Sequence, residues 1–163
     1  MLKRLAAAIV QRVPLARAIL RYGVARWGKP GVAAIIIHDR KVLLFKLVFW
    51  TAARWGLPGG GVEKGKDPAA AVVREVREEC GFELAIVRRL YSTPSDRSTY
   101  FVCAVPGLKA HVRPRRLSFE ILDADWFAPE ALPPGVLPIH RRVIHEVFGD
   151  GPARLRIESP APA

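Results

Sequence analysis

A run of glycines followed by a helix with three glutamates constrains the fold of this 163-residue chain more than any other feature. The glycines occupy positions 59–61, and Glu75, Glu78 and Glu79 lie near the end of the helical segment. Residues three and four apart on an α-helix share a face, so the three carboxylates are expected on one patch. Like charges at that spacing repel each other unless a cation compensates them. The patch is either a site for a hard divalent cation or an ordinary solvated acidic surface.

The residues around the glutamates occur at a recognisable spacing, which decides between these two interpretations. The pattern is a glycine, then arginine, glutamate and a bulky residue, then two adjacent glutamates and a glycine: Gly60, Arg74, Glu75, Val76, Glu78, Glu79 and Gly81, followed by Phe82. It resembles the signature of the Nudix hydrolase family, G-x5-E-x7-R-E-U-x-E-E-x-G-U, where U is bulky and aliphatic. One position departs, because Lys66 stands where the signature has its first glutamate. The resemblance favours the metal site.

Membership of this family would imply a fold and a reaction. The implied fold is an α/β/α sandwich with a mixed β-sheet, and the implied activity is hydrolysis of a pyrophosphate linkage in a nucleoside diphosphate derivative. The reaction would depend on Mg²⁺, with Mn²⁺ as an alternative. The expected metal ligands are Glu75, Glu78, Glu79 and the backbone carbonyl of Gly60. The expected catalytic residues are Glu75, Glu79, Arg74 and Glu120, and which glutamate acts as the general base stays open.

Aromatic and basic side chains are candidates for substrate binding. Trp55 and Tyr100 could stack on a nucleobase, although such residues more often fill a core. Arg54 and Lys64 could contact phosphate, as could Arg97, although each is also an ordinary kind of surface charge. Lys66 keeps a second function open, a Nudix-like module that binds a nucleotide, lipid or protein partner without turnover. Nucleic acid is a weaker alternative, because the sequence shows no strong signal for it.

The N-terminal segment 1–29 carries a large share of the net charge of +11. It contains seven Lys or Arg residues and no acidic residue, and its apolar residues follow a helical stripe that Pro14 interrupts. The pattern predicts a basic amphipathic helical extension. Packing on the same domain, or on a second copy in a homodimer, is preferred over peripheral contact with an anionic membrane.

Hydrophobic patterning predicts one domain over residues 30–149 and a loose tail over 150–163. Strands are expected at 31–38, 41–49, 83–91, 98–105 and 120–127, and the first two form a hairpin around the dipeptide at 39–40. Asp67 and Pro68 are expected to begin the glutamate helix and Gly81 to end it. A closing helix is expected at 139–148. The two cysteines are interpreted as packing residues, and a cytoplasmic location is expected.

Overall fold

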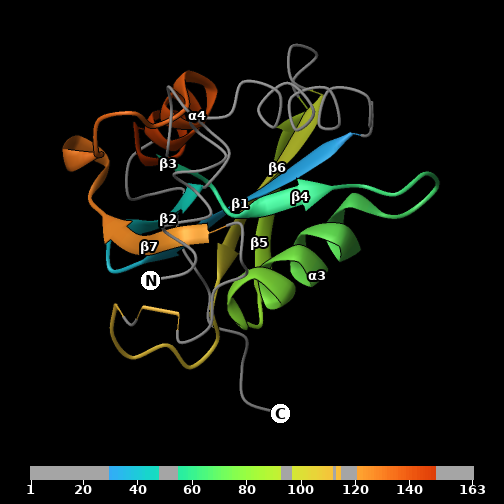
Figure 1. Ribbon diagram of the computed structural model, residues 1–163, viewed down its shortest axis with the longest axis horizontal. Coiled ribbons are helices and arrows are strands. Elements are labelled where there is room, and N and C mark those ends of the chain that lie inside the picture. Colours follow the sequence, from blue (N-terminus) through green and yellow to red (C-terminus); the bar gives the residue numbers. More distant parts are fainter. Residues whose placement is uncertain (1–29, 48–54, 93–96, 112, 115–120, 150–163) are drawn as a thin grey trace, which may run out of the picture.

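The structure, a computed structural model, describes residues 30–47, 55–92, 97–111, 113–114 and 121–149 (Figure 1). In chain order its elements are β1 (Gly31–His38), β2 (Lys41–Leu47), β3 (Trp55–Gly56), β4 (Gly59–Gly61), α3 (Pro68–Cys80), β5 (Ala85–Ser92), β6 (Ser98–Ala104), β7 (Ile121–Phe127), the 3₁₀ turn η1 (Pro129–Ala131) and α4 (Pro138–Gly149).

The strands form one mixed sheet of seven strands in the order β3-β2-β1-β6-β5, with β4 paired to β1 and β7 paired to β2. Among the named strands of the described residues, β1 and β6 pair in parallel and the other pairs are antiparallel. The parallel register starts at Gly31 opposite Ser98. The predicted mixed sheet is therefore confirmed.

The turn between β1 and β2 follows from local backbone preference. Asp39 and Arg40 both adopt positive φ, 43° and 59°, the conformation of a two-residue turn whose twist matches the flanking strands. Ile37 then pairs with Val42, and His38 with Lys41. The predicted hairpin is confirmed.

Alternate residues of β1 enter two different cores. Val32, Ala34 and Ile36 pack in the cluster that contains the buried face of α3, whereas their neighbours in the strand pack in the cluster that contains α4. Successive side chains of a strand point to opposite faces, so a central strand covered on both sides reads as continuously apolar. Figure 1 shows α3 and α4 on different sides of the sheet. Burial of apolar side chains in these two cores thus holds both helices against the sheet.

The sequence did not predict every element. The short strands β3 and β4 and the turn η1 were not expected, while the other strands and both helices lie within a few residues of their predicted positions. The predicted N-terminal helical extension, the end of the second strand beyond Leu47, the loop to residue 54 and the C-terminal tail lie outside the described residues. In the described part of the chain, no helix has the length and apolarity to cross a membrane.

Candidate active site

Helix α3 is set in place at both ends by residues that the sequence identifies. The side chain of Asp67 accepts hydrogen bonds from the backbone N–H groups of Ala69 and Ala70, each 3.2 Å long. Gly81 ends the helix with φ of 76°, and its N–H donates to the carbonyl of Arg77. The N-cap stabilises the first turn, and Gly81 ends the helix shortly after the last glutamate.

Strand β4 runs beside the glutamate-bearing face of α3. The backbone N–H of Gly59 donates to Oε2 of Glu79 over 3.1 Å. A Cβ atom added to Gly60 would lie only 2.4 Å from the carboxylate of Glu75. The missing side chain at Gly60 therefore leaves room for this carboxylate to touch the strand. The glycine run and the helix form one site.

Arg74 links two of the three glutamates. Its guanidinium donates to Oε1 of Glu75 over 2.6 Å and to Oε2 of Glu78 over 3.1 Å. The charge of Glu75 is the main cause that raises the pKa of Arg74 above its usual value, and the hydrogen bonds to both glutamates add to it. The side chain of Glu75 is 19% exposed and that of Glu78 is 59% exposed. The i, i+4 spacing on the helix accounts for the pair with Glu78, and the structure adds the pair with Glu75.

The three carboxylates have different hydrogen-bond partners. Glu75 and Glu78 turn to Arg74, while Glu79 faces Gly59. Among the residues that the structure describes, no group of three His, Cys, Asp or Glu side chains is arranged to hold a metal ion. The donor set still suits Mg²⁺ or Mn²⁺, because it consists of carboxylate oxygens beside the half-buried glycine backbone of β4. The room at Gly60 fits such a site, since it lets the half-buried carboxylate of Glu75 lie against β4.

Lys66, the departure from the family signature, lies beside the start of α3. Its side chain is exposed and forms no ion pair with any described residue. Together with Arg74, Glu63 and Asp67 it lines a hollow of about 280 Å³ beside the first turns of α3. A positive charge therefore stands near the carboxylate cluster without neutralising it.

The candidate substrate-binding residues have different positions. Tyr100 is fully buried in the core beneath α4, where its ring meets His140 edge to face, so the expectation that it stacks on a base is wrong. Trp55 is half-buried, with its ring 5.0 Å from that of Phe127. Lys64 is exposed beside a cavity. Arg54 and Glu120 lie outside the described residues.

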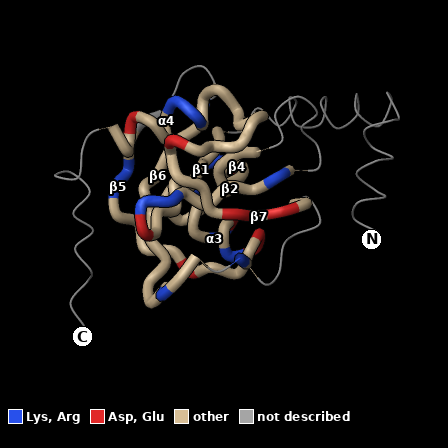
Figure 2. The backbone as a smooth tube through the Cα atoms, turned by 90° about the vertical axis from the view of Figure 1, so that its left-hand side faces the viewer, with Lys and Arg blue, Asp and Glu red and all other residues tan. Residues whose placement is uncertain are grey.

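A second group of acidic residues, on β7, was not predicted. Figure 2 shows the acidic residues along this strand. Asp123 and Asp125 both accept hydrogen bonds from the guanidinium of Arg113. Arg113, a basic residue of the segment after β6, thus pairs with the two aspartates of β7. Alternation of Asp with buried residues in the sequence of β7 was the available signal.

Both cysteines are buried in the core beneath α3, as their interpretation as packing residues predicted. Burial raises the pKa of Cys80 to about 11 and that of Cys103 to about 12. Neutral, buried thiols are poor nucleophiles and poor metal ligands. They take no part in the site.

Comparisons with known proteins agree with this geometry. The chain is 31% identical over 121 residues to the NAD-capped RNA hydrolase NudC of Pseudomonas aeruginosa, covering 73% of this chain and 42% of that protein. It thus spans about two fifths of that relative's length. It is 30% identical over 121 residues to a putative 8-oxo-dGTP diphosphatase of Bacillus subtilis, covering 71% and 77%.

A solved structure shares the fold. The solution structure of the E. coli ORF135 protein superposes with a TM-score of 0.59 at 27% identity, covering 78% of this chain and 94% of that one. The sequence matches the NUDIX domain family over residues 28–147, which include β4, α3 and all three glutamates. The chain belongs to the NUDIX domain family.

Proposed function

We propose that this protein is a divalent-metal-dependent hydrolase that cleaves a pyrophosphate linkage in a nucleoside diphosphate derivative. The observation that carries the proposal is the contact of β4 with α3. Gly59 donates to Glu79, and Gly60 leaves room for the carboxylate of Glu75. Members of this family typically use a divalent metal. The glycine strand β4 thus lies beside the carboxylate oxygens of α3 with no side chain in between. Hard oxygen ligands with free space beside them suit a metal-bound diphosphate.

Each residue of the site has a proposed role. Glu75, Glu78 and Glu79 hold Mg²⁺ or Mn²⁺, and the carbonyl of Gly60 joins them. Such a cation, when bound, neutralises phosphate oxygens and lowers the pKa of a water. Arg74 orients Glu75 and Glu78 through its two hydrogen bonds. Glu75 or Glu79 accepts the proton of the attacking water.

Residues outside the helix complete the proposal. Glu120 supplies a further carboxylate, Trp55 stacks on the base, and Arg54 and Lys64 contact phosphate. Two further hypotheses concern partners: association into a homodimer, and peripheral membrane contact through residues 1–29.

The test is a panel of nucleotides with Mg²⁺ or Mn²⁺, scored by product mass. The panel includes 8-oxo-dGTP and NAD, which the names of two relatives suggest, together with nucleotide sugars and dinucleoside polyphosphates. We expect Glu79→Gln and Glu78→Gln to lower the rate at least about 100-fold, which corresponds to about 2.7 kcal/mol of barrier. Glu83→Gln is the matched control, because Glu83 is exposed and pairs with Arg77 outside the site. Full turnover by Glu79→Gln would refute the assignment.

A module that binds its ligand without turnover is the second candidate, and Lys66 is the observation that favours it. Lysine replaces a signature glutamate, and two of the remaining glutamates are paired with Arg74. This candidate predicts saturable nucleotide binding but no product with any metal. The hydrolase proposal instead predicts that product forms with metal and that chelating the metal stops its formation.

A further inference from the structure

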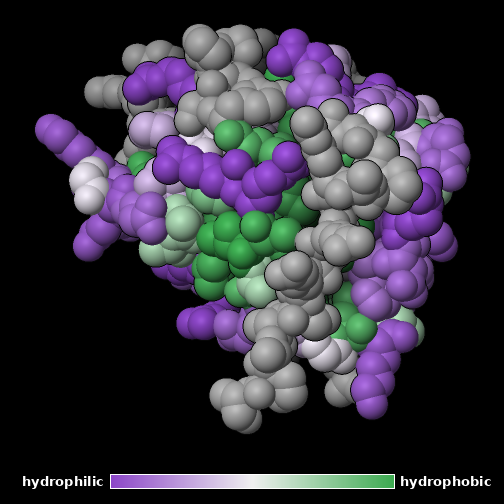
Figure 3. All heavy atoms as spheres, turned by 180° about the vertical axis from the view of Figure 1, so that it is seen from behind, coloured by the Kyte–Doolittle hydropathy of each residue, from purple (hydrophilic) through white to green (hydrophobic). Residues whose placement is uncertain are grey.

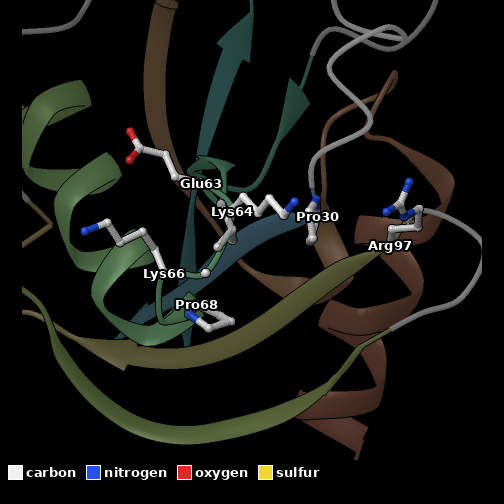
Figure 4. A pocket seen from close by; sticks show the side chains of 8 residues that line it. Pro30, Glu63, Lys64, Lys66, Pro68 and Arg97 are labelled. Atoms are coloured by element: carbon white, nitrogen blue, oxygen red, sulfur yellow. The ribbon is translucent and has the colours of Figure 1, made fainter.

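A cavity of about 440 Å³ lies next to the carboxylate site, between the loop from β4 to α3 and the starts of β1 and β6. Its size is within the range of small-molecule pockets. Pro30, Val62 and Pro68 give it an apolar lining, while Lys64 and Arg97 stand at its edge. Figure 4 shows Lys64 reaching across toward Pro30 and Arg97, whereas Lys66 points the other way, toward α3. We name the cavity with Lys64 and Arg97 the basic hollow.

Backbone hydrogen bonds fix the walls of the basic hollow. The N–H of Gly31 donates to the carbonyl of Arg97 over 3.0 Å, and the N–H of Val62 donates to the carbonyl of Pro30 over 2.7 Å. A third bond, of 3.0 Å, joins the N–H of Lys66 to the carbonyl of Glu63 and closes the loop. Residues far apart in sequence are therefore brought together by the pairing of β1 with β4 and β6. A preorganised site costs less conformational entropy on binding.

The charge of the basic hollow is uncompensated among the described residues. Neither Lys64 nor Arg97 forms an ion pair with any of them, although Arg74, Arg77, Arg113 and Arg142 all do. Glu63 and Lys66 carry opposite charges and offset one another. Two positive charges remain on one side of the cavity. They match the charge of a terminal phosphate group, which is close to −2 at pH 7.

We propose that the basic hollow binds a terminal phosphate of the substrate, so that the preferred substrate ends in a free phosphate rather than in a sugar or second nucleoside. The inference rests on the proposed hydrolase function for its substrate, but not for the binding itself. The basic hollow and the hollow lined by Arg74 share Glu63 and Lys66. The second hollow reaches Arg74, which bonds to Glu75 and Glu78, so the two hollows connect the basic hollow with the site.

The first test measures binding without catalysis. Inorganic triphosphate is titrated calorimetrically into the protein in EDTA, so that no metal takes part. Lys64→Gln and Arg97→Gln are each expected to weaken binding about tenfold. Lys109→Gln removes the same charge from an exposed residue beyond the opposite end of β6, roughly 20 Å away along the strand, and is expected to bind like wild type. Equal affinity in all four proteins, or no binding by wild type, would overturn the proposal.

The second test asks about substrate choice. With Mg²⁺, kcat/KM is compared for a nucleoside triphosphate and for the matching nucleotide sugar. Lys64→Gln and Arg97→Gln are each expected to lower the value at least fivefold more for the triphosphate than for the nucleotide sugar. An equal loss on both substrates would refute the assigned role. Triphosphate binding that depends on Lys64 and Arg97, without turnover of any nucleotide, would refute the hydrolase function and leave the basic hollow standing.

Discussion

Two adjacent glycines of β4 have different reasons to lack a side chain. At Gly60 the three atoms nearest to an added Cβ all belong to the carboxylate of Glu75, the far end of a flexible side chain. At Gly59, where φ is 151°, it would lie 2.1 Å from the backbone carbonyl oxygen of Val32. A side chain can rotate away from such a contact, whereas a paired strand cannot. The absence of a side chain at Gly60 therefore makes room in the site, whereas its absence at Gly59 allows β4 to pair with β1.

We accordingly predict that Gly60→Ala lowers hydrolysis at least about tenfold, because Glu75 must leave β4, while stability changes by less than about 0.5 kcal/mol. Gly59→Ala should instead destabilise the fold by about 1–3 kcal/mol. Urea unfolding combined with steady-state rates separates the two effects. Gly149→Ala is the control, since its new Cβ meets nothing within 4 Å. A stable, fully active Gly60→Ala protein would contradict the role given to Glu75.

Lys66 yields a second prediction at this scale. Because the lysine is exposed and unpaired with any described residue, its charge repels a cation at the glutamates without blocking it. Lys66→Glu changes the local charge by two units. It should lower the Mg²⁺ concentration that gives half-maximal rate and raise hydrolysis at low metal.

The measurement is a Mg²⁺ titration of rate at saturating substrate for both proteins. Lys66→Gln should fall between them if charge is the cause. Superimposable curves would mean that Lys66 lies too far from the ions to matter. Zero activity in both proteins would favour the binding module.

At the scale of elements, the N-cap of α3 determines how the helix meets β4. Asp67 satisfies two N–H groups of the first turn, which otherwise have no partner within the helix. We predict that Asp67→Ala lowers the free energy of unfolding by about 1 kcal/mol. Asp67→Asn keeps an acceptor oxygen and should lose less than half of that. Chemical denaturation measures both, and an equal loss in the two variants would show that charge, not capping, matters.

At the scale of the whole molecule, the basic segment 1–29 is a sequence prediction that lies outside the described residues. If it packs on the domain or on a second copy, deleting residues 1–26 should lower the melting temperature or change the oligomeric state. Full-length protein should then fail to bind anionic vesicles. Calorimetry, light scattering and vesicle flotation test this. Salt-sensitive flotation that is lost on deletion would show a membrane role instead.

The sequence by itself determined the local features of this protein. Asp67 and Pro68 begin α3 and Gly81 ends it, because capping and left-handed φ depend on the residue itself and its nearest neighbours. The turn at Asp39 and Arg40 and the pairing of Arg74 with Glu78 are local in the same way. Nudix membership could also be predicted, because its signature is a spacing within one helix and its preceding loop.

Only the tertiary structure decided how these pieces meet. Three consecutive glycines have little strand preference of their own, and β4 exists because β1 pairs with it. The sequence suggests Tyr100 as a base-stacking residue, but in the structure it is buried in the core beneath α4. Lys64 and Arg97 become neighbours only because β1 lies between β4 and β6. The physical reason is common to all three: burial and pairing depend on which segments share a sheet, which local sequence does not specify.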